Sequence, residues 1–232
     1  MAVTCELDDA GILTVTLDDG DKNTFTPEVF AELTSALDDH PDASTILLLG
    51  RDGILSAGLD LRWMAERGPD GVADLLTAFG SCLMRWWTDP RPTVCAATGH
   101  AIAAGTMLAM ACDHAVATEG GFWGLTETQV GLPMPRFGLA LAAANLPADR
   151  LEDLILPGER IDAAEAVAAG FADVLVADQL TAVSRARDRA EVLAALPAAA
   201  YASTKERLRG AAAAEVLDGL AADIAELTAG LR

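Results

Sequence analysis

The stretch Thr93-Val-Cys-Ala-Ala-Thr-Gly-His-Ala-Ile-Ala-Ala-Gly-Thr-Met-Leu-Ala-Met-Ala-Cys-Asp113 contains a strand pattern and a helix pattern separated by a short turn. Residues 93–98 have the length and apolar character of a strand that is covered on both faces. Residues 103–111 are mostly small, which predicts a helix packed closely against its neighbours. The turn from Gly99 to Gly105 lets a ligand approach the backbone at Ala104, because its side chains are small.

Strand and helix patterns alternate upstream of this stretch. Residues 3–7 and 12–17 alternate apolar with polar side chains, which predicts a hairpin with one solvated face. A helix is predicted to begin at Pro27, after the capping residue Thr26, and residues 45–49 form a short buried strand. Strand, helix and strand in this order predict parallel pairing, so we expect an α/β fold with layered elements.

Helical patterns dominate the rest of the chain. Residues 70–87 carry apolar side chains at three- and four-residue steps, which predicts an amphipathic helix. Beyond Pro135 nearly everything is helical in pattern apart from a short strand at residues 173–176. Asp162 and Glu165 have the spacing of a capping box at a helix start.

Composition narrows the class of protein. A chain of 232 residues that is 52% hydrophobic can bury a sizeable core. Its formal net charge of -19 argues against nucleic acid as a partner, because phosphate backbones are bound by clustered Lys and Arg. The longest apolar stretch, residues 101–112, is shorter than the roughly 20 residues of a bilayer span, and the N-terminus lacks the pattern of a signal peptide. We expect a soluble, cytoplasmic protein with no membrane partner.

The cysteines and histidines do not have metal-site spacing. Cys5, Cys82, Cys95 and Cys112 include no C-x-x-C pair and lie among apolar residues, which predicts buried free thiols in a reducing compartment. The three histidines are scattered singly. We expect no metal site.

One carboxylate stands among apolar and neutral neighbours, Glu127 in the segment Gly124-Leu-Thr-Glu-Thr-Gln-Val-Gly-Leu-Pro133. Upstream, Ser56-Ala-Gly-Leu-Asp-Leu61 forms a second small-residue turn, whose amide at Leu59 could face a ligand. A single acid or base beside two backbone donors suits the movement of a proton next to a carbonyl group. Each motif taken alone has an ordinary structural explanation, namely a tight turn, close helix packing or a solvated glutamate.

Together, Ser56–Leu61, Ala103–Asp113 and Gly124–Pro133 resemble the enoyl-CoA hydratase/isomerase (crotonase) superfamily in order and spacing. The resemblance implies an α/β, crotonase-like (ClpP/crotonase) fold of repeated ββα turns, with a core at residues 1–177 and a helical trimerisation module at residues 178–232. It implies an acyl-CoA thioester as substrate, no other cofactor, and assembly into homotrimers or hexamers.

The resemblance also assigns site residues. It places the amides that hold the thioester oxygen on Leu59 and Ala104, and the catalytic carboxylate on Glu127. Arg62 matches an often basic position, so it either meets a phosphate of CoA or is a surface arginine. The expected substrate-contacting residues are Ala57, Gly58, Asp60, Leu61, Arg62, Gly105, Met107 and Trp123. Lys205 is expected on a solvated helix face.

Hydratases of this superfamily carry a second glutamate where this sequence has Met107. A thioether neither accepts nor delivers a proton, so the carboxylate pair that activates water is incomplete. The sequence around Glu127 is similar to that of enoyl-CoA delta-isomerases. This resemblance implies that the double bond of an enoyl-CoA moves from the 3- to the 2-position, a reaction of fatty acid β-oxidation. For that role Glu127 requires a desolvated pocket that raises its pKa.

Three alternatives remain open at this point. The chain could be a hydratase, or catalyse another crotonase-type reaction, in which Asp60, Glu119 or the substrate replaces the missing acid. It could instead bind acyl-CoA without turnover, although the retained Glu127 counts against this. A scaffold for protein assembly would show no affinity for CoA.

Overall fold

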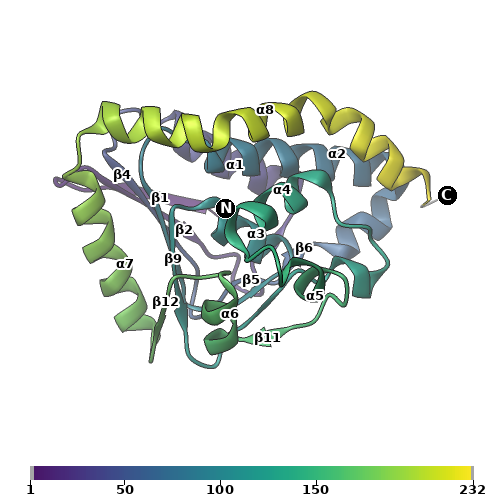
Figure 1. The fold of residues 1–232 in the computed structure, drawn as a ribbon, viewed down its shortest axis with the longest axis horizontal. Coiled ribbons are helices and arrows are strands. Elements are labelled where there is room, and N and C mark those ends of the chain that lie inside the picture. The colour runs from purple at the N-terminus through teal and green to yellow at the C-terminus, as the bar shows by residue number, and fades with distance from the viewer. Residues whose placement is uncertain (1–2, 231–232) are drawn as a thin grey trace.

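The computed structural model describes residues 3–230 and has the expected α/β architecture (Figure 1). A six-stranded sheet has the order β1-β2-β4-β7-β9-β12, in which only β1 runs antiparallel to its neighbour. Its strands are β1 (Val3–Leu7), β2 (Ile12–Leu17), β4 (Thr45–Leu49), β7 (Thr93–Ala97), β9 (His114–Thr118) and β12 (Val174–Val176). The predicted hairpin, the buried strands and the parallel pairing are confirmed.

A second sheet has the order β11-β10-β8-β5, and a two-stranded sheet pairs β3 with β6. Strands β5, β8 and β10 are parallel neighbours, so their carboxyl ends lie along the same edge. The strands are β3 (Thr24–Phe25), β5 (Gly53–Ser56), β6 (Gly58–Leu59), β8 (Gly99–Ile102), β10 (Phe122–Gly124) and β11 (Ile161–Asp162).

Helices cover the sheets. They are α1 (Pro27–Asp38), α2 (Leu61–Trp87), α3 (Ala104–Ala111), α4 (Arg136–Asn145), α5 (Leu151–Ile155), α6 (Ala163–Ala169), α7 (Gln179–Ala194) and α8 (Ala198–Ala229), with a short 3-10 helix η1 (Glu127–Val130). The predicted cap at Asp162 is confirmed, because its carboxylate accepts a hydrogen bond from the backbone N–H of Glu165 at 2.9 Å. Helix α8 runs across the top of the molecule, above α1 and α2 (Figure 1).

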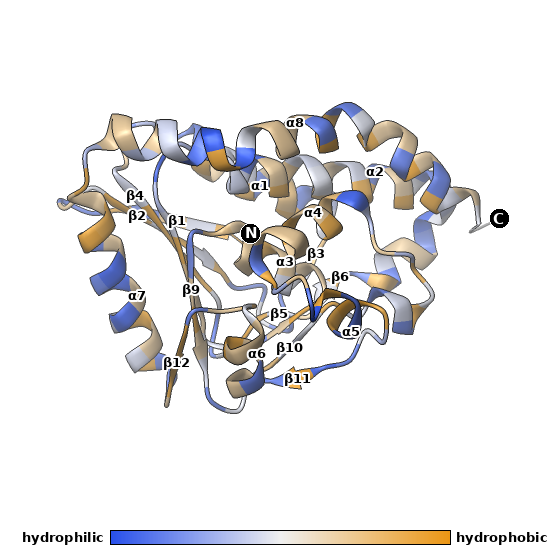
Figure 2. Cartoon of the chain, in the orientation of Figure 1, coloured by the Kyte–Doolittle hydropathy of each residue, from blue (hydrophilic) through white to orange (hydrophobic). Residues whose placement is uncertain are grey.

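Two apolar cores lie on opposite faces of the six-stranded sheet. The larger core joins the sheet to α1, α2, α3 and α4. In the smaller core, Ala182, Ala186 and Ala190 of α7 pack on Leu47 of β4 and Val94 of β7. The four-residue spacing of these alanines places them on one helix face, and Figure 2 shows polar residues on the side of α7 turned away from the sheet.

Helix α2 begins earlier than the apolar pattern predicts. The predicted helix at residues 70–87 is its second part, and a first part starts at Leu61 after the capping residue Asp60. Gly68, with a φ of 66°, breaks the helix between the parts, and Pro69 starts the second part. The short first part has no long apolar repeat, which is why periodicity did not reveal it.

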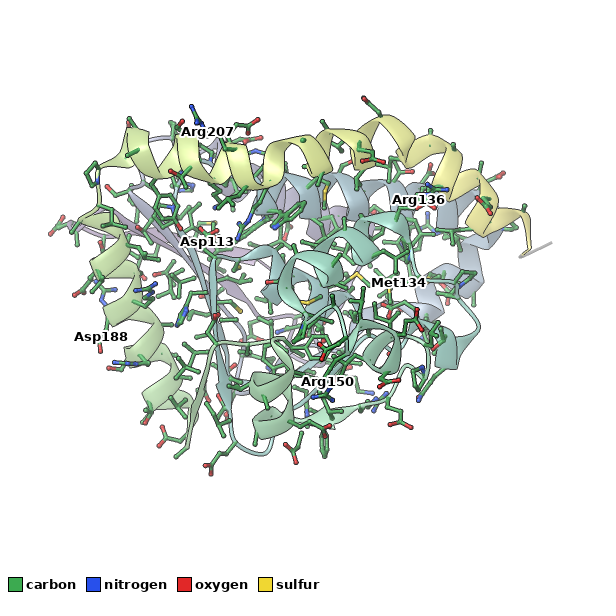
Figure 3. All side chains as sticks on the ribbon, in the orientation of Figure 1. Asp113, Met134, Arg136, Arg150, Asp188 and Arg207 are labelled. Carbon is green, nitrogen blue, oxygen red and sulfur yellow. The ribbon has the colours of Figure 1, made fainter. Side chains whose placement is uncertain are left out.

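The start of α8 is fixed to the sheet by buried charges, and the expectation of a solvated Lys205 is wrong. The side chain of Lys205 is 5% exposed, and its Nζ lies 2.7 Å from one carboxylate oxygen of Asp113. The other oxygen of Asp113 lies 2.6 Å from Arg209. Asp113 lies beneath α8 in Figure 3. Helical propensity predicts that α8 forms but does not say which of its faces is covered.

Two other expectations concern the cysteines and the division of the chain into a core and a helical module. Cys82, Cys95 and Cys112 are buried free thiols as predicted, but Cys5 is exposed on the edge strand β1, in which only Val3 is buried. Both C-terminal helices pack on the core, α7 on the sheet and α8 on α2. The division of the chain at residue 178 therefore stays a prediction.

Replacing Asp113 tests the anchoring of α8. Asp113→Asn keeps the shape of the side chain but leaves Lys205 and Arg209 without their counter-ion, so we expect the free energy of unfolding to fall by about 3 kcal/mol. Glu66→Gln is the control, because it breaks an exposed ion pair with Arg62 and should cost less than about 1 kcal/mol. Urea unfolding measures both, and equal losses would contradict the anchoring role.

Candidate active site

The three sequence motifs meet because they follow neighbouring strands. The Ser56–Leu61 turn leaves the end of β5, the Ala103–Ala104 turn leaves β8, and the segment that reaches Glu127 leaves β10. Since these strands are parallel and adjacent, the three connections emerge at one edge. In open parallel sheets this edge is where ligands bind.

The first turn is tightly packed against the second. The hydroxyl of Ser56 accepts a hydrogen bond from the N–H of Gly58 at 3.0 Å and donates to the carbonyl of Asn23 at 2.6 Å. Gly58 has a φ of 99°, and a Cβ built on it would lie 3.1 Å from the Cβ of Ala103 and 3.6 Å from the amide nitrogen of Ala104. A larger residue at this position would therefore crowd the start of α3.

The direction of the Leu59 amide follows from the neighbouring hydrogen bond. The N–H of Asp60 donates to the carbonyl of Phe25 on β3 at 3.0 Å. Successive N–H groups of an extended chain point to opposite sides, so the N–H of Leu59 points away from β3. Leu59 lines the same cavity as Glu127.

The second turn ends in a strained residue. Ala103 has a φ of 52°, a conformation that is unfavourable for residues with a Cβ. Its N–H donates to the carbonyl of Gly124 at 2.8 Å, and its own carbonyl accepts from Met107 at 3.0 Å. Ala104 is the first residue of α3, so its N–H has no acceptor within the helix.

Glu127 is buried at the start of η1. It is 8% exposed, and its Oε2 has no hydrogen-bond partner among residues 3–230. It lines a narrow cavity of about 20 Å³, whose other walls are Leu59, Leu76, Phe79, Leu132, Pro133, Pro135 and Leu227. The carboxyl group therefore lies in apolar surroundings that come from α2, the loop after η1 and the end of α8.

Burial raises the pKa of Glu127 to about 7, against an ordinary value of 4.5, and a hydrogen bond from its own backbone N–H opposes this only in part. The predicted burial and the direction of the pKa shift are confirmed. A carboxyl group that titrates near neutral pH is present in both its protonated and its ionised form, so it can accept a proton and return it.

The other predicted residues differ in their surroundings. Gly105 lies against β5, since a Cβ built on it would be 2.7 Å from the carbonyl of Ser56. Ala57 donates its N–H to the carbonyl of Lys22 at 3.0 Å. Met107 is fully buried and packs against Gly138 of α4. A Cβ built on Gly138 would lie 3.0 Å from the methyl carbon of Met107.

Four more predicted residues lie around the start of α2 or in the core. Asp60 caps α2 by accepting from the N–H of Trp63 at 2.9 Å. Leu61 is 54% exposed, and Arg62 is exposed and pairs with Glu66 at 3.0 Å. Trp123 is fully buried in the larger core. Of the eight predicted substrate-contacting residues, none lines the cavity at Glu127 in the described part of the chain.

Sequence reasoning missed most of the cavity walls. Phe79, Leu132 and Leu227 were not assigned to the site from the sequence. Phe79 belongs to the apolar repeat of α2, which is evident in the sequence, whereas Leu227 reaches the cavity only because α8 folds back over α2. No local pattern predicts that contact.

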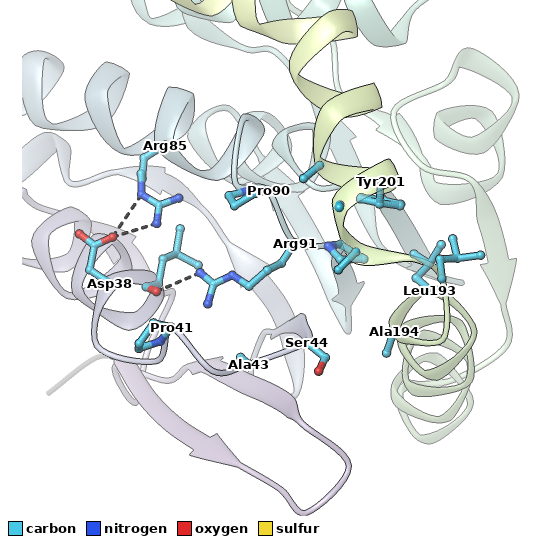
Figure 4. Close-up of a pocket in the computed structure, with 16 residues that line it drawn as sticks. Asp38, Pro41, Ala43, Ser44, Arg85, Pro90, Arg91, Leu193, Ala194 and Tyr201 are labelled. Carbon is cyan, nitrogen blue, oxygen red and sulfur yellow. Dashed lines mark hydrogen bonds and ion pairs between the residues drawn. The ribbon is translucent and has the colours of Figure 1, made fainter.

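A larger pocket of about 700 Å³ lies elsewhere, between the end of α1, the link from α2 to β7 and the link from α7 to α8 (Figure 4). Its guanidinium groups are already paired, Arg85 with Asp38 and Asp89, and Arg91 with Asp89 and the carbonyl of Leu37. The pocket borders the first turns of α8, whereas Leu227 lies near the other end, roughly 40 Å away along the helix. It is separate from the site at Glu127.

Two further properties concern the described chain as a whole. Within residues 3–230, no group of three or more His, Cys, Asp or Glu side chains is arranged to hold a metal ion. In the same range, no helix combines the length and apolar character needed to cross a membrane.

Comparison with known proteins shows which family the chain resembles. The family model described as enoyl-CoA hydratase/isomerase matches residues 8–229. The probable enoyl-CoA hydratase echA8 of Mycobacterium bovis is 32% identical over 203 residues, covering 85% of this chain and 77% of that protein. Enoyl-CoA delta isomerase 3 of Arabidopsis thaliana is 29% identical over 192 residues, covering 78% of this chain and 81% of that protein.

A solved structure is similar over the full length. The crystal structure of human mitochondrial delta3-delta2-enoyl-CoA isomerase superposes with a TM-score of 0.94 at 26% identity. The match covers 100% of this chain and 92% of that one. The crotonase fold expected from the sequence is confirmed.

The pH dependence of stability tests the burial of Glu127. Because the folded-state pKa is about 7 and the ordinary value is 4.5, the folded protein binds more protons between these pH values, and Glu127 lowers the free energy of unfolding as pH rises through this range. The free energy of unfolding of Glu127→Gln, measured relative to that of the native protein, should therefore increase by about 3 kcal/mol from pH 4.5 to pH 8. Urea unfolding at both pH values measures this, and a difference that does not change with pH would contradict it.

Proposed function

The chain belongs to the enoyl-CoA hydratase/isomerase family, and we propose that its reaction is the conversion of 3-enoyl-CoA to 2-enoyl-CoA. The observation that carries this proposal is one buried carboxyl group, Glu127, with a raised pKa and an unpartnered oxygen in an apolar cavity. One such group is sufficient for isomerisation, because the reaction removes and returns a single proton.

In the proposed reaction, ionised Glu127 takes a proton from C2 of the substrate, next to the thioester carbonyl. The electron pair of the broken C–H bond forms a dienolate, with negative charge on the thioester oxygen. Protonated Glu127 then delivers the proton to C4, so the double bond moves from C3–C4 to C2–C3. The carboxylate is regenerated, and no redox or metal chemistry is required.

The dienolate oxygen requires hydrogen-bond donors, and we assign this role to the backbone N–H groups of Leu59 and Ala104. The geometry supports the assignment because Gly58 packs against the amide of Ala104 and Leu59 shares the cavity of Glu127. Loss of one donor in comparable sites costs about 2.7–4 kcal/mol of transition-state stabilisation, so the amides matter as much as the base.

Hydration of a 2-enoyl-CoA is the alternative, and it is favoured by the names of several relatives, including echA8. Hydration requires a group that activates water and a group that protonates the α-carbon. The side chain at the position of the second glutamate is Met107, a fully buried thioether packed against α4. Within residues 3–230, Glu127 is the only carboxylate that lines the cavity, which favours isomerisation.

Further parts of the proposal follow the family. We propose that the CoA thioester binds without another cofactor, and that the exposed Arg62 at the start of α2 is available to a CoA phosphate. We also propose a homotrimer or hexamer that acts in the cytoplasm in fatty acid β-oxidation.

Activity assays on both substrates test the proposed reaction. We expect the native protein to convert 3-enoyl-CoA and to hydrate 2-enoyl-CoA poorly. Glu127→Gln should lower kcat for isomerisation by at least about a thousandfold, because the amide cannot carry the proton. The rate of the native protein should rise with pH up to about 7, as Glu127 ionises. Fast hydration of 2-enoyl-CoA without conversion of 3-enoyl-CoA would rule out the proposal.

The size of the cavity yields a second prediction. Its volume of about 20 Å³ is too small for an acyl chain of several carbons, so Leu76, Phe79 and Leu227 must move aside for one. Leu227→Ala removes a wall that α8 supplies and should raise kcat/KM for long-chain relative to short-chain 3-enoyl-CoA by about tenfold. Leu217→Ala, at an exposed position of α8, is the control. An unchanged chain-length profile would show that Leu227 does not limit the site.

A further inference from the structure

Thr106 occupies a central position between the two turns of the site. It lies in the first turn of α3 and is fully buried. Its Oγ1 is 2.6 Å from the carbonyl of Ala101 on β8, 3.1 Å from the carbonyl of Gly124 on β10, and 3.2 Å from the N–H of Gly124. One hydroxyl thus contacts the strand before the Ala104 turn and the strand before Glu127.

The hydrogen-bond inventory fixes the pattern of donors and acceptors. A hydroxyl has one proton to donate, and the shorter distance assigns it to the carbonyl of Ala101. The same oxygen accepts from the N–H of Gly124. The carbonyl of Gly124 in turn accepts from the N–H of Ala103 at 2.8 Å. Both polar groups of Gly124 are therefore bound to residues 103–106.

This arrangement holds a strained turn in place. Ala103 keeps its φ of 52° only if its surroundings compensate for the strain, and the bonds around Gly124 supply that restraint. Ala104, whose amide is the proposed donor, follows Ala103 directly, and Glu127 lies three residues after Gly124. Loss of the hydroxyl would leave the N–H of Gly124 and the carbonyl of Ala101 buried with one partner fewer.

We propose that Thr106 is a positioning residue, whose hydroxyl fixes the position of the Ala104 amide relative to the segment that carries Glu127. This inference rests on the proposed function, because it assigns both of these groups to the reaction. Thr106 does not contact substrate in this account. It acts through the placement of two groups that do, and a displacement of about 1 Å in such groups costs on the order of a hundredfold in rate.

The test compares three variants with the native protein. Thr106→Val removes the hydroxyl and should lower kcat for 3-enoyl-CoA about 10-fold to 100-fold, with KM within about threefold because ground-state contacts remain. Thr106→Ser keeps the hydroxyl and should retain kcat within about threefold. Thr118→Val is the matched control, since it removes a buried hydroxyl that donates to the carbonyl of Ala97 at 2.8 Å, on β9 and away from the site.

Two outcomes would overturn the positioning role. One is a kcat for Thr106→Val equal to that of Thr118→Val at a similar loss of Tm, and the other is a Thr106→Ser variant as slow as Thr106→Val. If Thr106→Val does not fold, Thr106→Ala serves the same comparison.

A binding measurement separates this inference from the proposed function. The enolate of a 3-ketoacyl-CoA carries its charge on oxygen without turnover, and its near-ultraviolet absorbance reports binding. Thr106→Val should weaken enolate binding at least tenfold, and unchanged binding would overturn the positioning role alone. A native protein that binds the enolate but does not isomerise 3-enoyl-CoA would overturn the proposed reaction. The enolate affinity of Thr106→Val, compared with that of the native protein, would then decide the positioning role. A native protein that binds no enolate would overturn the amide pair and the role of Thr106 with it.

Discussion

A carboxyl group buried without a full set of hydrogen bonds is the constraint on which the site depends. Glu127 is 8% exposed, and its Oε2 finds no partner in the described part of the chain. Such burial disfavours the ionised form and is unfavourable for stability at neutral pH. It also brings the pKa to about 7, where the group can both accept and release a proton. The apolar walls from α2 and α8 are what maintain this state.

The backbone around Glu127 is held by the topology of the second sheet. Strands β5, β8 and β10 are parallel neighbours, so the turn before α2, the turn before α3 and the segment before η1 emerge together. Glycines at positions 58 and 105 allow these turns to touch, and Gly124 ties the second turn to the third segment. The site therefore combines a rigid backbone arrangement with one titratable side chain.

Much of this arrangement could be predicted from the sequence, because it depends on local patterns. The alternating strand and helix patterns predicted the α/β fold, and the resemblance of three ordered motifs to a family predicted its type. The lone Glu127 predicted the acid or base of the site. The contacts that close the site were not predictable in this way. Leu227 is a hundred residues from Glu127 in the sequence, and helical composition does not show which face of α8 is covered.

The buried charges under α8 illustrate the same limit. Lys205 was expected in solvent, since a lysine in an Ala-rich helix usually lies there, but Asp113 offers it a partner at 2.7 Å. Thr106 is a further case, because its role depends on the register of β8 against β10, which determines that Gly124 lies beside it. Tertiary register and long-range packing, which residue spacing does not encode, account for these differences.

The most direct measurement of the central claim follows the proton itself. A 3-enoyl-CoA that carries deuterium at C2 is converted in ordinary water, and the product is analysed for deuterium at C4. A single carboxyl group in a cavity of about 20 Å³ should return part of the deuterium it removed, because exchange with solvent is restricted. Product with deuterium at C4 is the predicted result. Product whose C4 proton comes entirely from solvent would contradict a shuttle by Glu127 alone.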